Sequence, residues 1–391
     1  MPCPDGTRTR RKQSTNPPTV FNVSRLMCAL FALSAAPAVA ETQGITEPRV
    51  FPAYRTDSPS CRPPEGLQKV LAFAQDNERD FMHGVGFGLS MAAKDRGLTY
   101  RVANARNDAQ RMTEHVERFR AEHVGAVVAA PVDAETLAPS LQRLIWGGAY
   151  VGTVVPPPAV TILNAPQYLT GKTLTLAAAE HIRRHFPTKA NVVLLTHDSL
   201  EFLAPRFVAM RDVLRDIPGV AIVADISPAT VDQVGGYATM TTVLLANPEI
   251  HVVLGADTVV LGALKATRAA GKIRPNQFFG GIDGEPEAVK ELKANGSPYR
   301  VSVSLASPVF GYAMGQHAAD WLEGKSIPQA IDILPRALTR DTIAQYEADL
   351  ANPGAVYADA TRRDLYLRMY GNICYETRDQ YVNFPWNSER K

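Results

Sequence analysis

The amino-acid sequence predicts an α/β protein of two doubly wound lobes, each a parallel sheet covered by helices and joined to the other by a hinge. Three observations support this fold class. Short apolar runs alternate with segments of helical period through most of the 391 residues. The apolar runs are nearly continuous, which is typical of strands buried on both faces. The alternation also begins again near residue 166, so the chain repeats one construction.

The first strand and helix lie within residues 66–97. An apolar run at residues 70–74 predicts a buried strand, and a polar stretch at residues 76–80 follows it. From Phe81 onward, apolar residues recur every three or four positions, which predicts a helix that Gly97 ends. In open α/β sheets, ligands bind beyond the carboxyl ends of the strands. The polar stretch is therefore the first candidate for a binding site.

The rest of the first lobe follows the same pattern. Asn107 and Asp108 are suitable caps for a second helix, because short polar side chains accept hydrogen bonds from the free amides of a first turn. A third helix is expected at residues 134–146. The other strands predicted for this lobe are residues 100–103, 124–129 and 149–155.

The second lobe is expected to alternate in the same way. It begins with a helix through Thr173 that ends near His185. Further helices are predicted at residues 203–216, 231–245, 259–270 and 286–294, and strands at 191–196, 220–224, 251–255 and 278–282. A strand at 299–305, a helix at 308–322 and an apolar run at 331–334 follow. Beyond residue 337 the chain is polar and aromatic, with one further helix predicted at 341–350.

The composition is that of a globular protein, with 46% hydrophobic and 20% charged residues. A formal net charge of +2 gives no reason to expect nucleic-acid binding. Residues 1–40 combine a basic leader, an apolar core and the small-residue site Ala38-Val39-Ala40, which predicts a signal peptide cleaved after Ala40. The apolar core is shorter than the roughly 20 residues of a membrane anchor. We therefore expect an exported protein.

Two of the four cysteines, Cys61 and Cys374, remain after the predicted cleavage. An even number of cysteines in an oxidising compartment favours a disulfide. The alternative is two unpaired, buried thiols. Residues 41–66 are rich in proline and polar side chains, and we expect this N-terminal arm to be ordered only if Cys61 is bridged.

The order and spacing of these segments over residues 67–337 resemble the type I periplasmic substrate-binding proteins, which include the ribose- and galactose-binding proteins of ABC importers. The resemblance implies a first lobe of residues 67–165 and 305–327, a second lobe of 166–304 and 328–338, a three-strand hinge and a C-terminal extension of 339–391. It rests on the first strand and helix and on three motifs: Ala130-Pro131-Val132-Asp133, Gly255-Ala256-Asp257 followed by Leu261-Gly262-Ala263, and Gly281-Ile282-Asp283-Gly284.

The same resemblance implies a function. Proteins of this kind close two lobes on a small molecule in the periplasm and present the closed form to an ABC permease in the membrane. The resemblance implies no cofactor, no metal ion and no chemistry on the ligand, so we do not expect an enzyme. We expect a monomer that binds no nucleic acid.

Several positions depart from the sugar-binding members. Those proteins place an Asp-Arg pair where this chain has Val155-Pro156-Pro157-Pro158, an Asn where it has Ala256, and a hinge Gln where it has Leu305. The Arg that heads a second-lobe helix aligns with Ala204, or with Arg206 if the loop is shifted. A buried hydroxyl without a partner costs about 1–3 kcal/mol. We therefore expect a ligand with fewer hydroxyl groups than a free hexose, or one held at a different end of the cleft.

The candidate ligand-binding residues follow the carboxyl ends of predicted strands or lie at the hinge. Each has a structural alternative: Asp283 as a turn residue before glycine, Asp257 as a helix cap and Phe81 as a core residue. The remaining positions belong to loops, which are polar wherever they are solvated. The full set is Asn77, Arg79, Phe81, His197, Asp198, Phe202, Asp257, Asp283 and Ser304, with Ser307 as a further donor near the hinge.

Metal and catalytic sites are not indicated. His181 and His185 are four residues apart on a predicted helix, but an arginine pair between them would repel a cation. Basic residues at a helix end, complementing the helix dipole, explain them better. Ser199 lacks a G-x-S-x-G surrounding, and no P-loop or dinucleotide fingerprint is present. The glycines at 84, 86 and 88 fall inside a helical pattern, where they allow close packing.

Alternative functions stay open. A carrier of an apolar ligand, such as a lipid or sterol, is favoured by Val155, the proline run after it and Leu305. A second alternative is a subunit that senses a ligand for a membrane receptor. An exported enzyme is the third.

Overall fold

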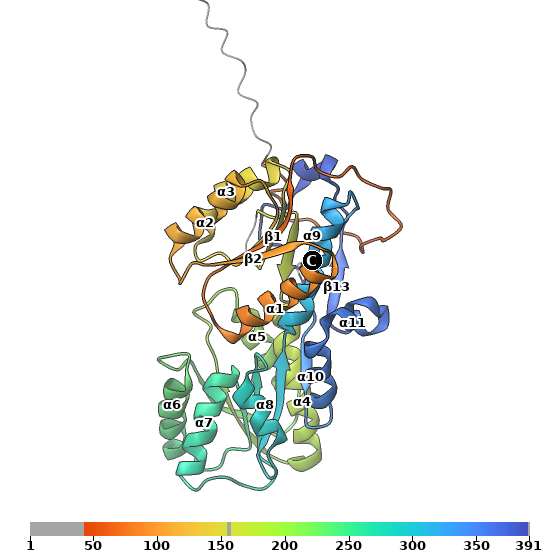
Figure 1. The fold of residues 1–391 in the computed structure, drawn as a ribbon. Coiled ribbons are helices and arrows are strands. Elements are labelled where there is room, and N and C mark those ends of the chain that lie inside the picture. The colour runs from red at the N-terminus through yellow and green to blue at the C-terminus, as the bar shows by residue number, and fades with distance from the viewer. Residues whose placement is uncertain (1–42, 155–157, 390–391) are drawn as a thin grey trace, which may run out of the picture. The chain divides into compact units, whose positions relative to one another are not determined.

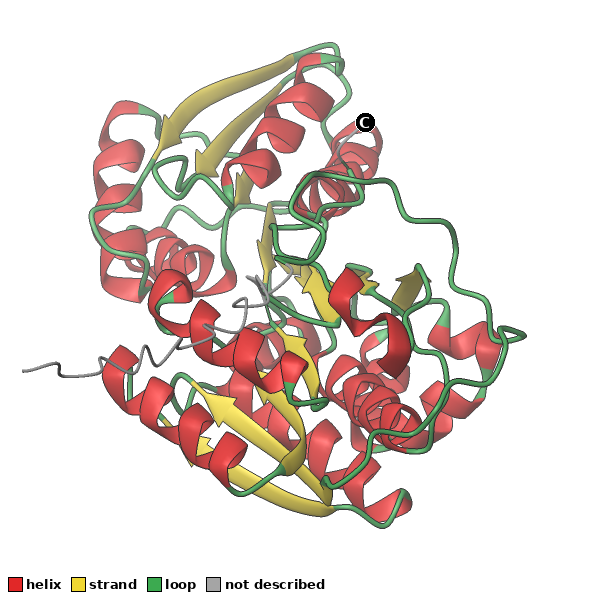
Figure 2. Cartoon of the chain, turned by 90° about the horizontal axis from the view of Figure 1, so that it is seen from above, coloured by secondary structure: helices red, strands yellow, loops and turns green. Residues whose placement is uncertain are grey.

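The computed structural model describes residues 43–154 and 158–389. They form two sheets, one of seven strands and one of six, with helices on both faces of each (Figure 1). Seen from above, strands lie between helices in both sheets (Figure 2). These two doubly wound sheets confirm the predicted fold class. The predicted signal peptide, its cleavage site at Ala40 and residues 155–157 lie outside the described residues.

The first sheet has the strand order β13-β11-β5-β4-β3-β1-β2. All its neighbouring strands are parallel except β13, which is antiparallel to β11. The sequence analysis missed β5, a four-residue strand that follows the proline run. The bounds are β1 (Gln68–Gln75), β2 (Thr99–Asn104), β3 (Val124–Ala129), β4 (Tyr150–Thr153), β5 (Thr161–Asn164), β11 (Ala330–Ile333) and β13 (Leu367–Tyr370).

Four helices cover the first sheet. α2 (Ala109–Ala121) and α3 (Ala134–Trp146) pack together on one face, and α1 (Asp80–Asp95) packs against α9 (Ser307–Leu322) on the other. The return of α9 to this lobe, which the resemblance implies, is thereby confirmed.

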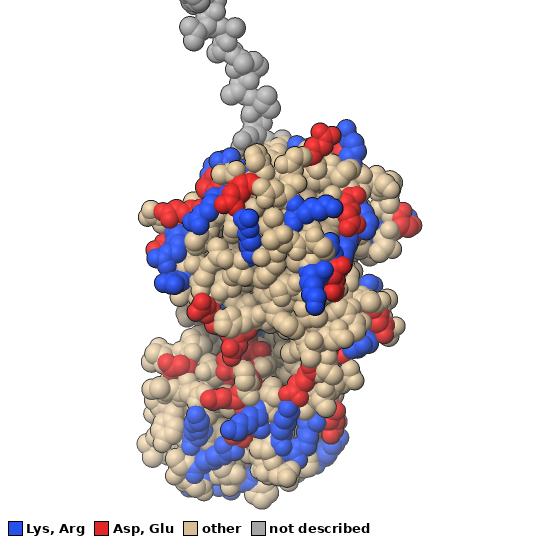
Figure 3. Space-filling view, viewed as in Figure 1, with Lys and Arg blue, Asp and Glu red and all other residues tan. Residues whose placement is uncertain are grey.

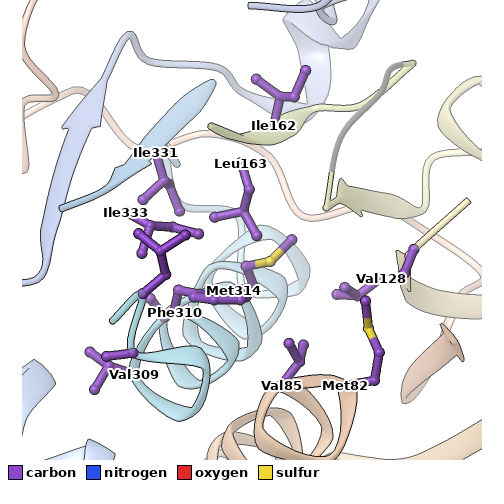
Figure 4. Packing of buried hydrophobic residues seen from close by; sticks show 14 of the residues in the cluster. Met82, Val85, Val128, Ile162, Leu163, Val309, Phe310, Met314, Ile331 and Ile333 are labelled. Carbon is purple, nitrogen blue, oxygen red and sulfur yellow. The ribbon is translucent and has the colours of Figure 1, made fainter. Parts of the chain in front are cut away.

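The core beneath α9 joins segments that are far apart in the sequence. Phe310 and Met314 of α9 point toward Leu163 of β5 and Ile331 of β11 (Figure 4). All four side chains are fully buried. A hydrophobic core of this kind fixes the edges of the strands, and therefore the loops that follow them.

The second sheet has the order β12-β10-β9-β8-β6-β7, and only β12 is antiparallel to its neighbour. α4 and α5 pack against each other on one side of it, while α6, α7 and α8 form a second group. The strands are β6 (Ala190–Leu195), β7 (Val220–Ile226), β8 (Val252–Leu254), β9 (Phe278–Ile282), β10 (Tyr299–Ser304) and β12 (Arg336–Leu338). The helices are α4 (Gln167–His185), α5 (Ala204–Arg215), α6 (Gln233–Ala246), α7 (Asp257–Ala269) and α8 (Pro286–Lys293).

The chain passes directly between the sheets at three connections, from β5 to α4, from β10 to α9 and from β11 to β12, and it returns to the first sheet once more through the helices between β12 and β13. The three direct connections form the three-strand hinge that the resemblance implies. One predicted boundary needs correction, because residues 328–338 do not all belong to the second lobe. β11 pairs with β5 in the first sheet, and only β12 joins the second. The apolar pattern of β11 suits a strand of either sheet, so the sequence does not show which sheet it joins. Its hydrogen bonds with β5 place it in the first sheet.

The C-terminal extension is ordered and contacts both lobes. It contains α10 (Ile343–Ala351), α11 (Pro353–Ala358), α12 (Ala360–Arg363), β13 and a 3₁₀ helix at Tyr375–Gln380. The expected disulfide is present between Cys61 and Cys374, whose Cα atoms are 5.6 Å apart. At the far end, the Glu389 carboxylate accepts hydrogen bonds from the backbone amides of Tyr168 and Leu169 in the first turn of α4.

Within the described residues, no helix combines the length and the apolar character that crossing a bilayer requires.

Candidate functional site

The loop after β1 is a network of polar side chains. Arg79 donates from Nη2 to Asp76 Oδ2 at 2.7 Å and from Nε to Asn77 Oδ1 at 3.0 Å. Asn77 in turn donates to Asn107 Oδ1, after β2, at 3.0 Å. The Arg79 side chain remains 56% exposed. The predicted site residues Asn77 and Arg79 thus lie together, oriented by neighbours and open to solvent.

Asp283 follows β9 in the second lobe and has an unusual backbone. Its φ of +121° lies in a region that non-glycine residues rarely adopt. Its amide donates to Val303 O at 2.8 Å, which helps to hold this conformation. The Asp283 side chain is 42% exposed, although protein surrounds it closely enough for desolvation to raise its pKa. Arg206 and Arg79, from the two lobes, oppose that rise.

Arg206 is the charged partner of Asp283. It lies in the first turn of α5 and is only 7% exposed. Its Nε donates to Gln167 Oε1 at 2.5 Å, and its Nη1 is 3.7 Å from Asp283 Oδ1, too far for a hydrogen bond. Burial lowers the pKa of Arg206, but a guanidinium stays protonated in proteins. The terminal nitrogens therefore keep donors for which the described residues supply no hydrogen-bond acceptor.

Close helix packing explains the position of Arg206. A Cβ atom at Gly171 of α4 would overlap the backbone of Arg206, so glycine allows the two helices to meet there. Pro205, with no amide hydrogen, suits the first turn of α5. The sequence analysis named Arg206 only as an alternative alignment, and this contact between helices is not visible in sequence.

Asp257 lies behind the Asp283 loop and is fully buried. It accepts hydrogen bonds from Tyr299 Oη and Ser302 Oγ, both at 2.6 Å, and from the backbone amide of Glu285 at 2.9 Å. Burial raises the pKa of Asp257 to about 6, against these hydrogen bonds. The structure therefore places Asp257 as a support of the loop, away from solvent, and its side chain does not cap α7.

Glu285 follows Asp283 in the same loop, and the sequence analysis did not name it. It is half-buried just before α8, two residues after Asp283. Burial raises the pKa of Glu285 to about 7, and the nearby carboxylates of Asp257, Asp283 and Asp80 act in the same direction. The signal available in sequence was an acidic residue directly after the Asp283-Gly284 pair.

The side chains of Phe81 and Ser304 already contact other residues of the protein. Phe81 is half-buried in the first turn of α1, with its ring centre 5.6 Å from that of Phe310. Ser304 is buried at the hinge, where its Oγ hydrogen-bonds Tyr346 Oη of the C-terminal extension. Leu305, beside it, is also buried. Ser307 begins α9 and faces Gly84 of α1.

The three residues predicted after β6, His197, Asp198 and Phe202, have different surroundings. Asp198 is bound by Arg211, whose Nη2 lies 2.5 Å from its Oδ2 and whose Nε lies 2.6 Å from Asp225 Oδ2. His197 Nδ1 is 2.8 Å from the backbone oxygen of Thr196. Phe202 is 69% exposed. Asp198 is therefore ion-paired with Arg211, and the ligand roles of His197, Asp198 and Phe202 stay predictions.

Neither histidine nor cysteine geometry in the described residues indicates a metal centre. His181 Nε2 is 2.7 Å from Asn276 O, which occupies the nitrogen a metal would need. Cys61, Cys374 and Glu376 are grouped closely, but both sulfurs are oxidised to a disulfide and are not thiolate ligands.

The distribution of charged side chains on the surface is consistent with a site between the lobes. Acidic side chains gather around the hollow between the upper and lower halves of the molecule, while most Lys and Arg lie elsewhere on this face (Figure 3). Arg79 from the first lobe and Arg206 from the second both act on Asp283. The loops after β1 and β9, with the start of α5, therefore make one candidate site.

Comparison with known proteins identifies the family. Residues 70–326 match the profile of the periplasmic binding protein domain. The chain belongs to this family. Periplasmic binding proteins of this kind serve ABC importers outside the cytoplasm and are not catalysts, so this chain is not an enzyme.

Two relatives have low sequence identity to this chain but align with it over most of their length. The ribose import binding protein RbsB of Bacillus subtilis (strain 168) is 24% identical over 264 residues, which are 62% of this chain and 78% of the relative. A putative rhizopine-binding protein of Rhizobium meliloti is 23% identical over 262 residues, or 64% of this chain and 83% of the relative. These proteins are similar to this periplasmic binding protein over the two lobes.

Solved structures share the fold. The periplasmic ribose ABC transporter protein from Conexibacter woesei DSM 14684 aligns with a TM-score of 0.64 at 16% identity, covering 73% of this chain and 96% of that one. A solute-binding protein of Thermotoga lettingae TMO, in complex with 5-methylthioribose, aligns with a TM-score of 0.59 at 22% identity, covering 76% and 94%. The type I fold of this periplasmic binding protein is thereby established.

Proposed function

We propose that this protein captures a sugar or a sugar-like polyol between its lobes for import by an ABC permease. The observation that carries the proposal is the pair formed by Arg206 and Asp283. A buried guanidinium, whose terminal nitrogens have no hydrogen-bond acceptor among the described residues, lies beside a carboxylate that is open to solvent. Donors and an acceptor side by side suit the hydroxyl group, which both accepts and donates.

The geometry argues for a hydroxylated ligand over an apolar one. An apolar molecule would desolvate Arg206 and Asp283 without replacing their water contacts, at about 1–3 kcal/mol per unpaired group and more for charged groups. Neighbouring hydroxyl groups would instead fill the forked donors of Arg206. This modifies the expectation of a weakly hydroxylated ligand, because the arginine missing at Ala204 is supplied by Arg206.

Relatives point to the same class of ligand. They include ribose and D-apiose import binding proteins, and solved structures of the same fold hold myo-inositol or D-allose. Each name describes that protein alone. Together they support a small polyol as the starting class for this chain.

A thermal-shift screen of the chain from residue 41 onward, followed by calorimetry, tests the proposal. Pentoses, hexoses, cyclitols and their substituted forms make one set, and fatty acids and sterols the other. Ligand at 100 times its Kd stabilises the folded state by about 2.7 kcal/mol, which is a visible shift in Tm. A shift with the second set alone would overturn the proposal.

Variants locate the binding event. Arg206→Met and Asp283→Asn are each expected to weaken binding of the best polyol at least tenfold, about 1.4 kcal/mol. Arg215→Gln is the matched control, since Arg215 lies on the same helix and points to solvent. Equal affinity of all three variants would place the ligand elsewhere.

Import is tested in cells. Deleting the gene should slow uptake of the labelled ligand at limiting concentration, and the intact gene should restore it. Normal uptake with a lost response toward the ligand would instead favour the sensing function.

A further inference from the structure

A groove of about 560 Å³ lies along the open edge of the first sheet. β2 is the last strand of that sheet, and β1 is its hydrogen-bonded neighbour. Side chains of β2 and α2 line the groove, together with residues of the loops that follow β1 and β2. Arg206 and Asp283, which carry the proposed function, do not line it. The groove is therefore a second feature of the surface, without a role so far.

The edge of β2 presents backbone groups to the groove. In a strand of a parallel sheet, alternate residues direct their N–H and C=O groups to opposite sides. The amide of Ala105 donates to Gln75 O of β1 at 2.9 Å, so Val102 and Asn104 direct theirs to the open edge. His115 Nε2 of α2 lies 3.3 Å from the Asn104 oxygen. The amide and carbonyl of Val102 have no partner in the described part of the chain, so another strand can pair there.

The side chains of β2 divide between the two faces of the sheet. Arg101 forms an ion pair with Glu122 of α2, so it lies on the α2 face. Tyr100 lies on the opposite face, where its Oη would be 3.2 Å from a Cβ atom at Gly86 of α1. Val102 comes two residues after Tyr100, shares its face and is 51% exposed. A strand added to this edge would therefore meet charged side chains on one face and an apolar side chain on the other.

The α2 side of the groove has an excess of positive charge. Arg106 and Arg118 line the groove and have no ion pair among the described residues. The lining carboxylates are those of Glu78 and Glu122, and Glu122 is already paired with Arg101. Within the described lining, two unpaired arginines thus face one unpaired carboxylate. The groove should attract a negatively charged partner.

Charge also decides between possible occupants. A second copy of this chain, paired edge to edge, would bring Arg101 close to the same residue of the other copy. Like charges on adjacent strands are destabilising, and charged side chains at a sheet edge oppose self-association for this reason. An acidic segment would instead form charge-assisted hydrogen bonds with Arg106 and Arg118. The observations favour a different, acidic chain over a second copy.

We propose that this groove binds an extended segment of a partner protein, in which acidic residues alternate with apolar ones. The segment adds a strand to the first sheet beside β2 and pairs with the backbone of Val102. Its carboxylates face Arg106 and Arg118, and its apolar side chains lie on the face of Val102. Adding a strand to an open sheet edge is a general mode of peptide recognition, in which the backbone supplies affinity and alternate side chains supply specificity.

Fluorescence anisotropy with synthetic peptides tests the proposal on the chain from residue 41 onward. The probe is a labelled octapeptide of alternating glutamate and valine. One comparison peptide alternates lysine with valine, and another has the composition of the probe with all its glutamates first. The probe is expected to bind at least tenfold more tightly than either, and less tightly as salt rises. Equal binding of the block peptide would overturn the proposal, because charge alone would then suffice.

Arginine variants locate the binding event. The double variant Arg106→Gln, Arg118→Gln is expected to weaken binding of the probe at least tenfold. Arg120→Gln is the matched control, because Arg120 also belongs to α2, does not line the groove and is paired with Glu117 at 2.8 Å. An unchanged affinity in the double variant would contradict the proposal.

A proline tests whether the peptide adds a strand. Val102→Pro removes an amide that points to the open edge and keeps the pairing with β1, so its Tm should stay near that of the wild type while probe binding is lost. Hydrogen exchange of the wild type gives the same information without a variant. The probe should slow exchange of the Val102 amide. Unchanged exchange with saturating probe would overturn the proposal.

Two other results would also contradict the proposal. If glutarate or inorganic phosphate binds as tightly as the probe, the groove holds a small anion and no peptide strand. If no peptide binds and the double arginine variant dimerises, the arginines serve to keep the sheet edge unpaired. Both results leave the proposed function standing, because they concern residues that do not include Arg206 or Asp283.

Discussion

Asp257 shapes the binding loop from behind, without facing the solvent. Its two oxygens accept hydrogen bonds from Tyr299, Ser302 and the amide of Glu285. The loop that carries Asp283 is thereby attached to α7 and β10. A buried carboxylate satisfied by three donors acts as a positioning residue, because its loss releases the loop.

Asp257→Ala is expected to lower the free energy of unfolding by about 2–4 kcal/mol, because three donors lose their acceptor. Ligand affinity should fall as well, since Asp283 loses its support. Asp257→Asn keeps one acceptor oxygen and should recover most of both losses. Urea unfolding and calorimetry measure the two effects. Unchanged affinity in a destabilised Asp257→Ala would show that the loop is held by other contacts.

His317 gives the fold a dependence on pH. It is buried in α9, its Nε2 lies 3.0 Å from Tyr357 Oη, and its Nδ1 has no hydrogen-bond partner within the described part of the chain. Burial lowers the pKa of His317 to about 4, with Arg363 and Arg96 lowering it further and Asp320 opposing them. The unfolded chain, with a histidine pKa near 6.5, therefore binds more protons between these values.

Stability from His317 is thus present above pH 6.5 and is lost as the pH falls toward 4, by up to about 3 kcal/mol. The difference in unfolding free energy between pH 7 and pH 4.5 should be smaller in His317→Gln than in the wild type. Urea titrations at both values measure it. Identical pH dependence in the two proteins would mean that His317 can be protonated without unfolding.

Prediction of single site residues depended on motifs. Asp283 was accessible from sequence because it stands in the Gly281-Ile282-Asp283-Gly284 motif. Arg206 required the contact of α4 with α5, and Glu285 required the loop conformation, neither of which a linear pattern contains. The ion pair of Asp198 with Arg211 was not visible in sequence, because Arg211 lies on the next helix. The ligand roles of Asn77, Arg79 and Phe81 stay predictions.

At the scale of elements, α1 and α9 pack at close range through glycines. A Cβ atom at Gly88 would overlap the carbonyl oxygen of Pro308, and one at Gly84 would overlap Ser307 Oγ. Gly311 of α9 has the same relation to the Val85 carbonyl. The close packing expected of these glycines is therefore confirmed, and it brings the hinge end of α9 to the start of α1.

Gly88→Ala is expected to destabilise the protein by about 1–3 kcal/mol, because backbone on α9 cannot yield easily to the added methyl group. Gly86→Ala on the same helix is the control. Its Cβ would lie 3.2 Å from Tyr100 Oη and 3.7 Å from the Phe73 ring, with no backbone atom in the way, and alanine favours the helix. Thermal unfolding of both variants tests the contrast. Equal Tm values would show that the helices separate at no cost.

The pattern of elements was largely predictable, and its failures have physical causes. Long segments with clear period, such as α1, α2 and β3, were found within a few residues of their observed bounds. β5 is short and follows prolines, so no period could develop. β11 and β13 take their places through hydrogen bonds with strands distant in the chain, β5 and β11. Such pairing is decided by tertiary structure.

For the whole molecule, the disulfide links the N-terminal arm to the extension across 313 residues of sequence. In the chain-entropy model, a loop of this size stabilises the folded state by up to about 5 kcal/mol. Reductant should therefore lower the Tm of the wild type. The double variant Cys61→Ser, Cys374→Ser should start at the lower Tm and not respond. A reduced protein with the original Tm would contradict this expectation.

The extension also reaches the second lobe. Arg340 donates to the backbone oxygens of Leu292 and Ala294 at the end of α8, Lys293 of α8 pairs with Glu347 of α10 at 2.5 Å, and Glu389 binds the start of α4. Other anchors, β13 and the disulfide among them, belong to the first lobe. The extension is therefore fastened on both sides of the hinge.

We expect these contacts on both sides of the hinge to limit how far the two lobes open in the unliganded protein. A smaller part of the binding free energy is then needed to close the lobes. The apparent Kd is therefore lower, and the protein binds ligand at lower concentrations. Glu389→Ala should enlarge the radius of gyration of the unliganded protein in small-angle X-ray scattering and leave that of the saturated protein unchanged. If the unliganded variant and the unliganded wild type have the same radius of gyration, the Glu389 contact does not restrain opening of the lobes. The extension thus ties together two lobes that are joined by three connecting segments, and we expect it to narrow the angle at which the empty protein rests.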